Sequence, residues 1–408
     1  MAPGWVELDR EPLKDGSRRF VRDRGEGSVS WGGLIGNRAR IAANDVHHPA
    51  YADLPPEQAA KRREADSLAA QIAEEIDADL LVTRRPYLQD NSRLSYDGVT
   101  ICTPEQALPL VGLYMRAQGE FYVSVETDGK AAYPVNQHAF YRIAVAEYLP
   151  ATWRWLAACA QHSTGTGNTG LAHTAGSLLL RVQRALQARD ELYAALNRPQ
   201  TVDSAEAQLN SLDTVLINLM GAVDISARVA HTVLGMPGSA HLVGWQKLKS
   251  FVHEVGKLEP ALAAVVAPGT DGQNALTILR LLRNCVHGAA LDPMTVSTGL
   301  LEHGRTLVGL PSQDVSELVS AMDALGGHLK VWGVQGLVGN RFHTDPGLLA
   351  DQLLVRILRL LEELLAKTPV ERLSHVALTP EQQAPPADPQ GPFSQTFRSN
   401  VRWQLGLM

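Results

Sequence analysis

The segment SAEAQLNSLDTVLINLMGAVDISARVAHTVLG, residues 204–235, is the strongest indication of fold in the larger part of this chain. Its apolar residues recur every three or four positions, which is the period of an α-helix. It carries more apolar residues than a helix on a protein surface needs, so it predicts a helix packed among others. Asp224 and Arg228 interrupt the pattern four residues apart, on one face of that helix. They are either a charged pair at the edge of the core or secondary candidates for a functional face.

Other segments of the second half of the chain have the same helical period. They span residues 138–160, 170–196, 274–288, 314–333 and 348–367. Turns that contain Gly or Pro separate them, and together they predict a helical bundle. The Pro- and Gln-rich stretch 379–392 predicts an extended linker. The final segment, 393–408, regains apolar residues, and we expect it to dock on the body of the protein or on a second subunit.

The first part of the chain has a different pattern. Residues 1–45 predict loops with one short strand, and residues 54–76 predict a helix. Short apolar runs at 77–83 and 98–102 predict two strands, and a second helix is expected from Pro104, with Thr103 as N-cap and Gln106 completing a capping box. Strands and helices that alternate over so short a distance predict a small α/β unit with a parallel sheet.

Composition and charge exclude several classes of protein. The 37 basic and 43 acidic side chains give a formal charge of −6, so any contact with nucleic acid requires a local basic patch. The three cysteines are far apart and have no metal-ligand or disulfide spacing. The N-terminal residues have no apolar signal region, and no apolar run is long enough to span a membrane. These observations predict a cytoplasmic protein with no membrane partner.

Two short motifs resemble a cofactor site and a metal site but do not indicate either. GTGNTG, residues 165–170, matches the dinucleotide-binding pattern in letters, but a helical segment precedes it where a strand is required, so we expect an interhelical loop. His47 and His48 are adjacent but have no third ligand at a recognisable spacing. The sequence therefore predicts no cofactor and no metal.

The segment RLLRNCVHG, residues 280–288, has the clearest polar face among the predicted helices. A helix rotates by about 100° per residue. The polar residues of this segment then fall within one arc of about 100° around the helix axis, and they are Arg280, Arg283, Asn284 and His287. Apolar residues fill the opposite side. His287 can transfer a proton near neutral pH, and an arginine can bind the non-bridging oxygens of a phosphate. This face suits phosphodiester cleavage without a metal, and the alternative is an ordinary solvent-facing side of a helix.

The pair formed by the helix of residues 204–235 and the later helix with RNCVHG resembles HEPN domains over residues 204–367. Members are helical bundles and are often metal-independent ribonucleases of defence or stress systems, with a site shared across a dimer. The resemblance implies Arg283 and His287 as catalytic residues and Arg280 and Asn284 as substrate-binding residues. It also implies RNA as substrate, a homodimer and a regulatory protein partner. The family's usual spacing between arginine and histidine is somewhat longer than the one found here.

A fainter resemblance concerns the first part of the chain. The segments ADLLVTRRPYLQD and GVTICTPEQAL are similar to the late strand–loop–strand of PIN-like domains. Arg85 stands where active members of that family have an acidic residue that helps to hold a divalent metal. The resemblance therefore implies a degenerate PIN-like domain without its metal.

The sequence thus predicts an α+β multidomain protein in which a small N-terminal α/β, PIN-like unit precedes a large all-α HEPN-like helical bundle. The predicted parts are the α/β domain at 1–130, connecting helices at 131–200, the bundle at 201–370, and a linker with an apolar tail at 371–408. The predicted function is a metal-independent endoribonuclease that cleaves RNA by attack of a 2′-hydroxyl. The alternative is a non-catalytic helical module for binding or dimerisation.

Overall fold

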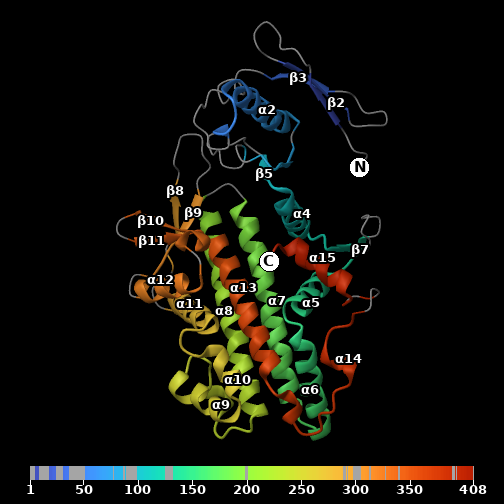
Figure 1. Cartoon of the computed structure of the whole chain (residues 1–408). Helices are drawn as coiled ribbons and strands as arrows, with labels where there is room; N and C mark the ends of the chain where they lie inside the picture. The colour runs from blue at the N-terminus through green and yellow to red at the C-terminus, as the bar shows by residue number, and fades with distance from the viewer. Residues whose placement is uncertain are drawn as a thin grey trace. The chain divides into compact units, whose positions relative to one another are not determined.

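The structure of this chain is a computed structural model, and its secondary structure divides into two compact units. The residues that it describes are 5–8, 18–23, 31–35, 51–76, 78–85, 88, 99–124, 132–197, 201–287, 291, 293–296, 305–311, 314–326, 328–338, 341–387, 391 and 393–407. The first unit comprises Met1–Leu110 with Ser297–Glu302, and the second comprises Val111–Val296 with His303–Met408. Helices predominate, with several small sheets, so the chain is an α+β protein with a large helical region (Figure 1).

The first unit contains two small sheets and the helix α2. Its elements are β1 (Trp5–Leu8), β2 (Arg18–Asp23), β3 (Trp31–Ile35), α2 (Pro56–Glu75), β4 (Leu80–Val82), β5 (Thr100–Cys102) and the start of α4 (Pro104–Ala117). The strands β4 and β5 are parallel, as predicted. The antiparallel sheet β1-β2-β3 corrects the expectation of loops with one short strand for residues 1–45. Strands of four to six residues are too short to give a clear period in the sequence.

The predicted capping box at the start of α4 is confirmed. The backbone N–H of Gln106 donates to Oγ1 of Thr103 at 3.2 Å, and the backbone N–H of Thr103 donates to Oε1 of Gln106 at 3.0 Å. These two bonds satisfy donors that the first helical turn leaves without an intrahelical partner, and so they fix where α4 begins.

Two long helices, α7 (Gly170–Leu196) and α8 (Val202–Val233), form the centre of the second unit. They lie side by side (Figure 1), and the short connection between them makes them antiparallel. Most of the apolar residues on these two helices are buried in one large core. A capping box between Thr201 and Ser204 starts α8. The further helices of this unit are α5 (Gln137–Tyr148), α6 (Ala151–Thr166), α9 (His253–Leu258), α10 (Pro260–Ala263), α11 (Asp271–His287), α12 (Val315–Ala324), α13 (Pro346–Lys367), α14 (Pro380–Gln383) and α15 (Gln395–Leu405).

Short helical turns and two sheets complete the second unit. The turns are η3 (Ala240–Leu242), η4 (Leu248–Val252), η5 (Ala264–Val266), η6 (Leu329–Trp332) and η7 (Val370–Arg372). The strands are β6 (Tyr122–Ser124), β7 (Ala132–Pro134), β8 (Pro293–Val296), β9 (Arg305–Gly309), β10 (Val334–Val338) and β11 (Arg341–Thr344). The motif GTGNTG lies at the turn between α6 and α7, where Gly167 has a φ of 73°, so the predicted interhelical loop is confirmed.

A four-stranded antiparallel sheet, in the order β10-β11-β9-β8, corrects the expectation that residues 201–370 form an all-α bundle. The predicted helix at 314–333 is also shorter than expected. It ends with α12, and Gly326 follows with a φ of 78°. The central pair of the sheet joins β9 to β11, more than thirty residues apart along the chain. A local hydrophobic period carries no information about such a pairing.

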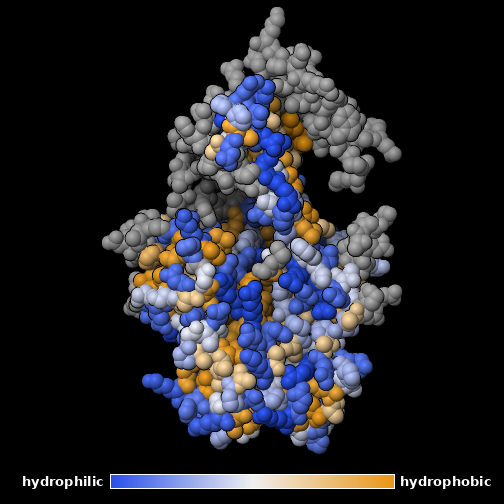
Figure 2. Space-filling view, in the orientation of Figure 1, coloured by the Kyte–Doolittle hydropathy of each residue, from blue (hydrophilic) through white to orange (hydrophobic). Residues whose placement is uncertain are grey.

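The surface of the described chain is mixed in character. On the face shown in Figure 2, hydrophilic residues alternate with smaller hydrophobic areas. None of the helices in the described ranges is both long and apolar enough to cross a lipid bilayer.

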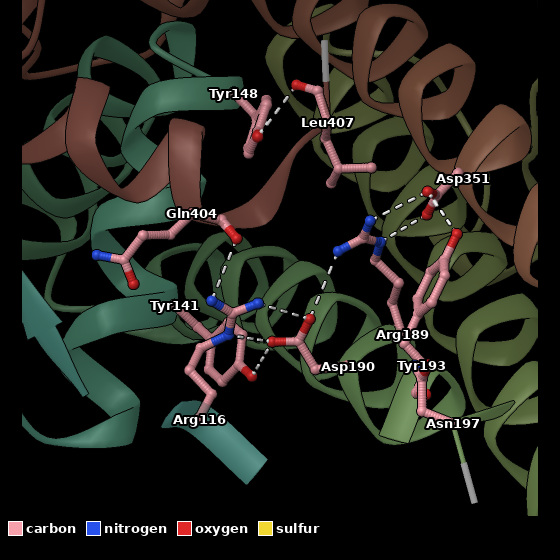
Figure 3. A network of polar contacts seen from close by, with 10 residues as sticks. All are labelled: Arg116, Tyr141, Tyr148, Arg189, Asp190, Tyr193, Asn197, Asp351, Gln404 and Leu407. Carbon is pink, nitrogen blue, oxygen red and sulfur yellow. Dashed lines mark hydrogen bonds and ion pairs between the residues drawn. The ribbon is translucent and has the colours of Figure 1, made fainter. Parts of the chain in front are cut away.

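A buried network of charged side chains connects α4, α5, α7 and α13 (Figure 3). Asp190 accepts hydrogen bonds from Nε of Arg116 at 2.5 Å and from the hydroxyl of Tyr141 at 2.8 Å. Arg189, its neighbour on α7, donates to both carboxylate oxygens of Asp351, at 2.5 and 3.0 Å. Each buried charge therefore has a counter-ion, and removal of one partner would leave another uncompensated.

The C-terminal helix α15 packs against α5 and joins this network. The backbone carbonyl of Gln404 accepts a hydrogen bond from Arg116 at 3.3 Å, and that of Leu407 accepts one from the hydroxyl of Tyr148 at 3.2 Å (Figure 3). Trp153 and Phe393 make an edge contact with ring centroids 5.6 Å apart. The final segment therefore docks on the body of the protein, which confirms that part of the prediction.

We expect Asp190→Asn to destabilise the second unit by about 3–5 kcal/mol, because Arg116 would lose its main buried counter-charge. Urea unfolding followed by circular dichroism measures this loss. The control is Glu254→Gln, which removes an exposed ion pair with Lys257 and should leave the unfolding midpoint nearly unchanged. Equal midpoints for Asp190→Asn and wild type would contradict a stabilising network.

Glu362 of α13 caps the start of α6. Both of its carboxylate oxygens lie 3.1 Å from the backbone N–H of Ala151. Burial raises the pKa of Glu362 from 4.5 to about 7, and the hydrogen bond from Ala151 offsets only part of this effect. A carboxyl group whose pKa is raised on folding stabilises the protein below its unfolded-state pKa, and this stabilisation is lost as the pH rises through the folded-state pKa.

Glu362→Gln should therefore raise the thermal midpoint at about pH 8 and have no effect below about pH 4.5. The pKa change corresponds to a difference of about 3 kcal/mol in the free energy of unfolding. Because Glu362 is partly exposed, solvent screening reduces the expected difference to about 1–2 kcal/mol. Thermal unfolding of both proteins across this range is the measurement. A difference between them that does not depend on pH would contradict the assignment to Glu362.

Candidate functional site

A pocket of about 350 Å³ lies against α7, α8 and α11 in the second unit. Its polar lining residues come from all three helices and are Thr174, Ser177, Arg181, Asp224, Arg228 and Arg283. Apolar side chains of α8, including Met220 and Ile225, complete the lining. The pocket therefore combines three cations with one carboxylate, in a cavity large enough for a small ligand or for part of a polymer.

The three arginines of the pocket contact no counter-ion among the residues that the structure describes. In the part of the chain that the structure describes, none of Arg181, Arg228 and Arg283 forms an ion pair. Nε of Arg228 is buried and has no hydrogen-bond partner there. A guanidinium group presents its donors in a planar fork that matches phosphate and carboxylate oxygens. These arginines therefore offer donors to an anionic ligand.

Asp224 is the acidic residue of the pocket. Burial raises the pKa of its carboxyl above the ordinary value, and Arg228, a hydrogen bond from Gln246, Arg283 and Arg181 oppose this rise. Its Oδ1 is buried and has no hydrogen-bond partner among the described residues. The expected pairing of Asp224 with Arg228 is electrostatic, since no contact within ion-pairing distance joins their side chains in the described structure.

Gly221 of α8 makes room for Arg181. A Cβ atom at position 221 would lie 2.5 Å from Nη1 of Arg181, which is shorter than any normal contact. The arginine side chain of α7 thus crosses α8 at the point where that helix has no side chain. The sequence analysis missed Arg181. A glycine inside an otherwise apolar helix was the signal for a close approach at this point.

The hydroxyl groups of the pocket donate their protons elsewhere. Thr174 donates to the carbonyl of Gly170 at 2.8 Å, and Ser177 donates to the carbonyl of His173 at 2.9 Å. Both bonds run one turn back along α7, a common pattern for these residues in helices. Each hydroxyl oxygen therefore faces a ligand as an acceptor.

The structure separates the residues that the sequence grouped on α11. Arg283 lines the pocket together with Asp224 and Arg228. Arg280, one turn earlier, forms an ion pair with Glu317 of α12 at 2.7 Å. Asn284 is exposed. The backbone of His287 belongs to the last turn of α11, but its side chain lies outside the described residues.

The first unit pairs two residues that bear on the PIN-like resemblance. Arg85 forms an ion pair with Asp66, whose side chain is almost fully buried. Asp66 also accepts a hydrogen bond from the hydroxyl of Tyr51 at 2.7 Å. A carboxylate that an arginine and a phenol already occupy has less capacity to bind a metal. Within the described ranges, no group of three or more potential metal ligands is found.

No known family model, curated protein or solved structure matches this chain. The HEPN-like and PIN-like resemblances therefore stay predictions from short motifs. A function is therefore inferred from the side chains that line the pocket.

We expect Gly221→Ala to weaken the binding of inorganic pyrophosphate about tenfold, because the new methyl group displaces the guanidinium of Arg181. Isothermal titration calorimetry measures the affinity. The matched control is Gly176→Ala on α7, where a Cβ atom meets nothing within 4 Å. Equal affinities for Gly221→Ala and wild type would show that Arg181 does not bind the anion.

Proposed function

We propose that this protein is a metal-independent endoribonuclease of the HEPN type, in which the arginine pocket binds a phosphodiester of RNA. The observation that carries the proposal is the convergence of Arg181, Arg228 and Arg283 on one cavity without ion-paired partners among the described residues. Phosphate is the anion for which arginine is the preferred residue in nucleic-acid recognition. The overall charge of −6 makes such a local cluster necessary for RNA binding.

The proposed reaction begins with attack of a ribose 2′-oxygen on the adjacent phosphorus. The O2′–P bond forms and the P–O5′ bond breaks, which leaves a 2′,3′-cyclic phosphate and a 5′-hydroxyl group. His287 takes the proton of the 2′-hydroxyl and returns a proton to the 5′-oxygen. Arg283 binds the non-bridging oxygens, where negative charge accumulates in the transition state.

The placement of Arg283 and His287 on α11 supports this division of roles. The two residues are four positions apart, so His287 follows Arg283 by about one turn of the helix. An arginine that binds the phosphate therefore brings the scissile bond to the end of α11 that carries the histidine. Arg280 and Asn284 are candidates for contacts to the flanking strand, and Arg280 would first have to leave Glu317.

Cleavage of a mixed RNA pool in the presence of EDTA tests the proposal. Wild type should produce 2′,3′-cyclic phosphate ends. His287→Ala should reduce the rate about 10²- to 10⁴-fold, and Arg283→Ala should reduce it about 10²- to 10³-fold. The control variant is Arg359→Ala, which removes an exposed arginine of α13 and should cleave at the wild-type rate.

Two outcomes would overturn the proposal. One is equal cleavage by wild type and by both folded variants, which would indicate a contaminating nuclease. The other is pyrophosphate or RNA binding without any cleavage, which would favour the alternative of a non-catalytic binding module.

A further inference from the structure

The pocket contains hydrogen-bond acceptors as well as cations. Asp224 is the carboxylate that lines it, and the hydroxyl oxygens of Ser177 and Thr174 act as acceptors because their protons go to backbone carbonyls. A ligand that carries only phosphate oxygens has no donor for these groups. The negative charge of Asp224 would also weaken the attraction that the three arginines exert on such a ligand.

The acceptors lie together, because α7 and α8 are antiparallel. Arg181 of α7 lies against Gly221 of α8. One turn before Arg181 on α7 is Ser177, and one turn after Gly221 on α8 is Asp224. In an antiparallel pair these two steps run in the same direction, so Ser177 and Asp224 lie at the same level of the pocket. The guanidinium of Arg181 is then about one turn away.

This arrangement matches a phosphate with a neighbouring hydroxyl group. We propose that Asp224, with Ser177, accepts a hydrogen bond from the 2′-hydroxyl of a nucleotide that flanks the scissile one, on the strand whose phosphate the arginines hold, and so selects ribonucleotides over deoxyribonucleotides. The inference rests on the proposed function, since it takes RNA as the ligand. Asp224 is thereby a specificity-determining residue. The 2′-hydroxyl is the group by which proteins distinguish RNA from DNA.

The partial burial of Asp224, whose Oδ1 is excluded from solvent, strengthens the discrimination. A deoxyribonucleotide brings no donor to the carboxylate, which then stays desolvated beside the bound phosphate. A site built to bind a hydroxyl group rejects an analogue that lacks it, because its own polar groups are left unpaired. We expect RNA to bind about tenfold more tightly than DNA of the same length, which corresponds to about 1.4 kcal/mol in binding free energy.

Fluorescence anisotropy with short labelled oligouridylates tests this inference. The full-length His287→Ala protein is used so that RNA is not cleaved during the measurement. Three probes of one length are compared, with 2′-hydroxyl, 2′-deoxy and 2′-fluoro sugars. The 2′-fluoro probe keeps the sugar shape of RNA but has no donor at the 2′ position, so it separates hydrogen bonding from shape. It should bind as weakly as the deoxy probe.

Replacement of the acceptor supplies the decisive comparison. Asp224→Ala in the His287→Ala background should reduce the tenfold preference for RNA to less than about twofold, even if all three probes bind more tightly once the negative charge is gone. The matched control is Asp213→Ala, which removes a half-buried carboxyl of α8 outside the pocket lining and should keep the preference. If Asp224→Ala does not fold, Ser177→Ala replaces it, because Ser177 lies at an exposed position. This variant should also reduce the ratio of RNA affinity to DNA affinity.

The outcomes separate this inference from the proposed function. An RNA preference that Asp224→Ala leaves unchanged would overturn the inference alone. A 2′-fluoro probe that binds as tightly as RNA would do the same, because shape would then account for the preference. Absence of binding to all three probes would overturn the proposed function and the inference with it.

Discussion

The packing of α7 against α8 is the constraint on which the second unit depends. Both helices are apolar along most of their length, and most of their apolar side chains are buried in a single core. Two such helices joined by a short connection can bury these surfaces only as an antiparallel pair. The pair then determines which polar residues face each other. Gly221 lies against Arg181, and Ser177 and Asp224 line the same pocket, so the pocket follows from the packing of the two helices.

Two groups of arginines in this unit illustrate how ion pairing separates structural from functional charges. Arg116 and Arg189 are buried, and each has a carboxylate partner in hydrogen-bonding distance (Figure 3). Burial lowers the pKa of Arg189, but the adjacent Asp351 more than offsets this and raises it above the ordinary value. Such buried pairs hold helices together, and their charges are already neutralised by a carboxylate. The arginines of the pocket lack such partners in the described structure, which leaves their donors available.

Asp224 explains how a cluster of three arginines can exist in the absence of a ligand. A single carboxylate reduces the repulsion among the guanidinium groups without pairing directly with any of them. Arg280 shows the opposite situation on the neighbouring turn of α11, since it meets a carboxylate of α12 at the surface. The two arginines of one helical face thus have different surroundings, and their chemical roles differ accordingly.

Features that depend on near neighbours along the chain could be predicted from the amino-acid sequence alone. The sequence predicted the helical period of residues 170–196 and 204–235 and the capping box at Thr103, because hydrogen bonds and hydrophobic faces within a few turns leave a local pattern. The parallel pair β4–β5 was predicted on other grounds, from the alternation of short strands and helices along the chain. Three features could be seen only in the folded protein: the sheet of β8–β11, the pairing of Arg280 with Glu317 and the approach of Arg181 to Gly221. Each of these joins segments that are far apart in the chain. Periodicity shows which face of a helix is buried, but it does not show which partner covers that face.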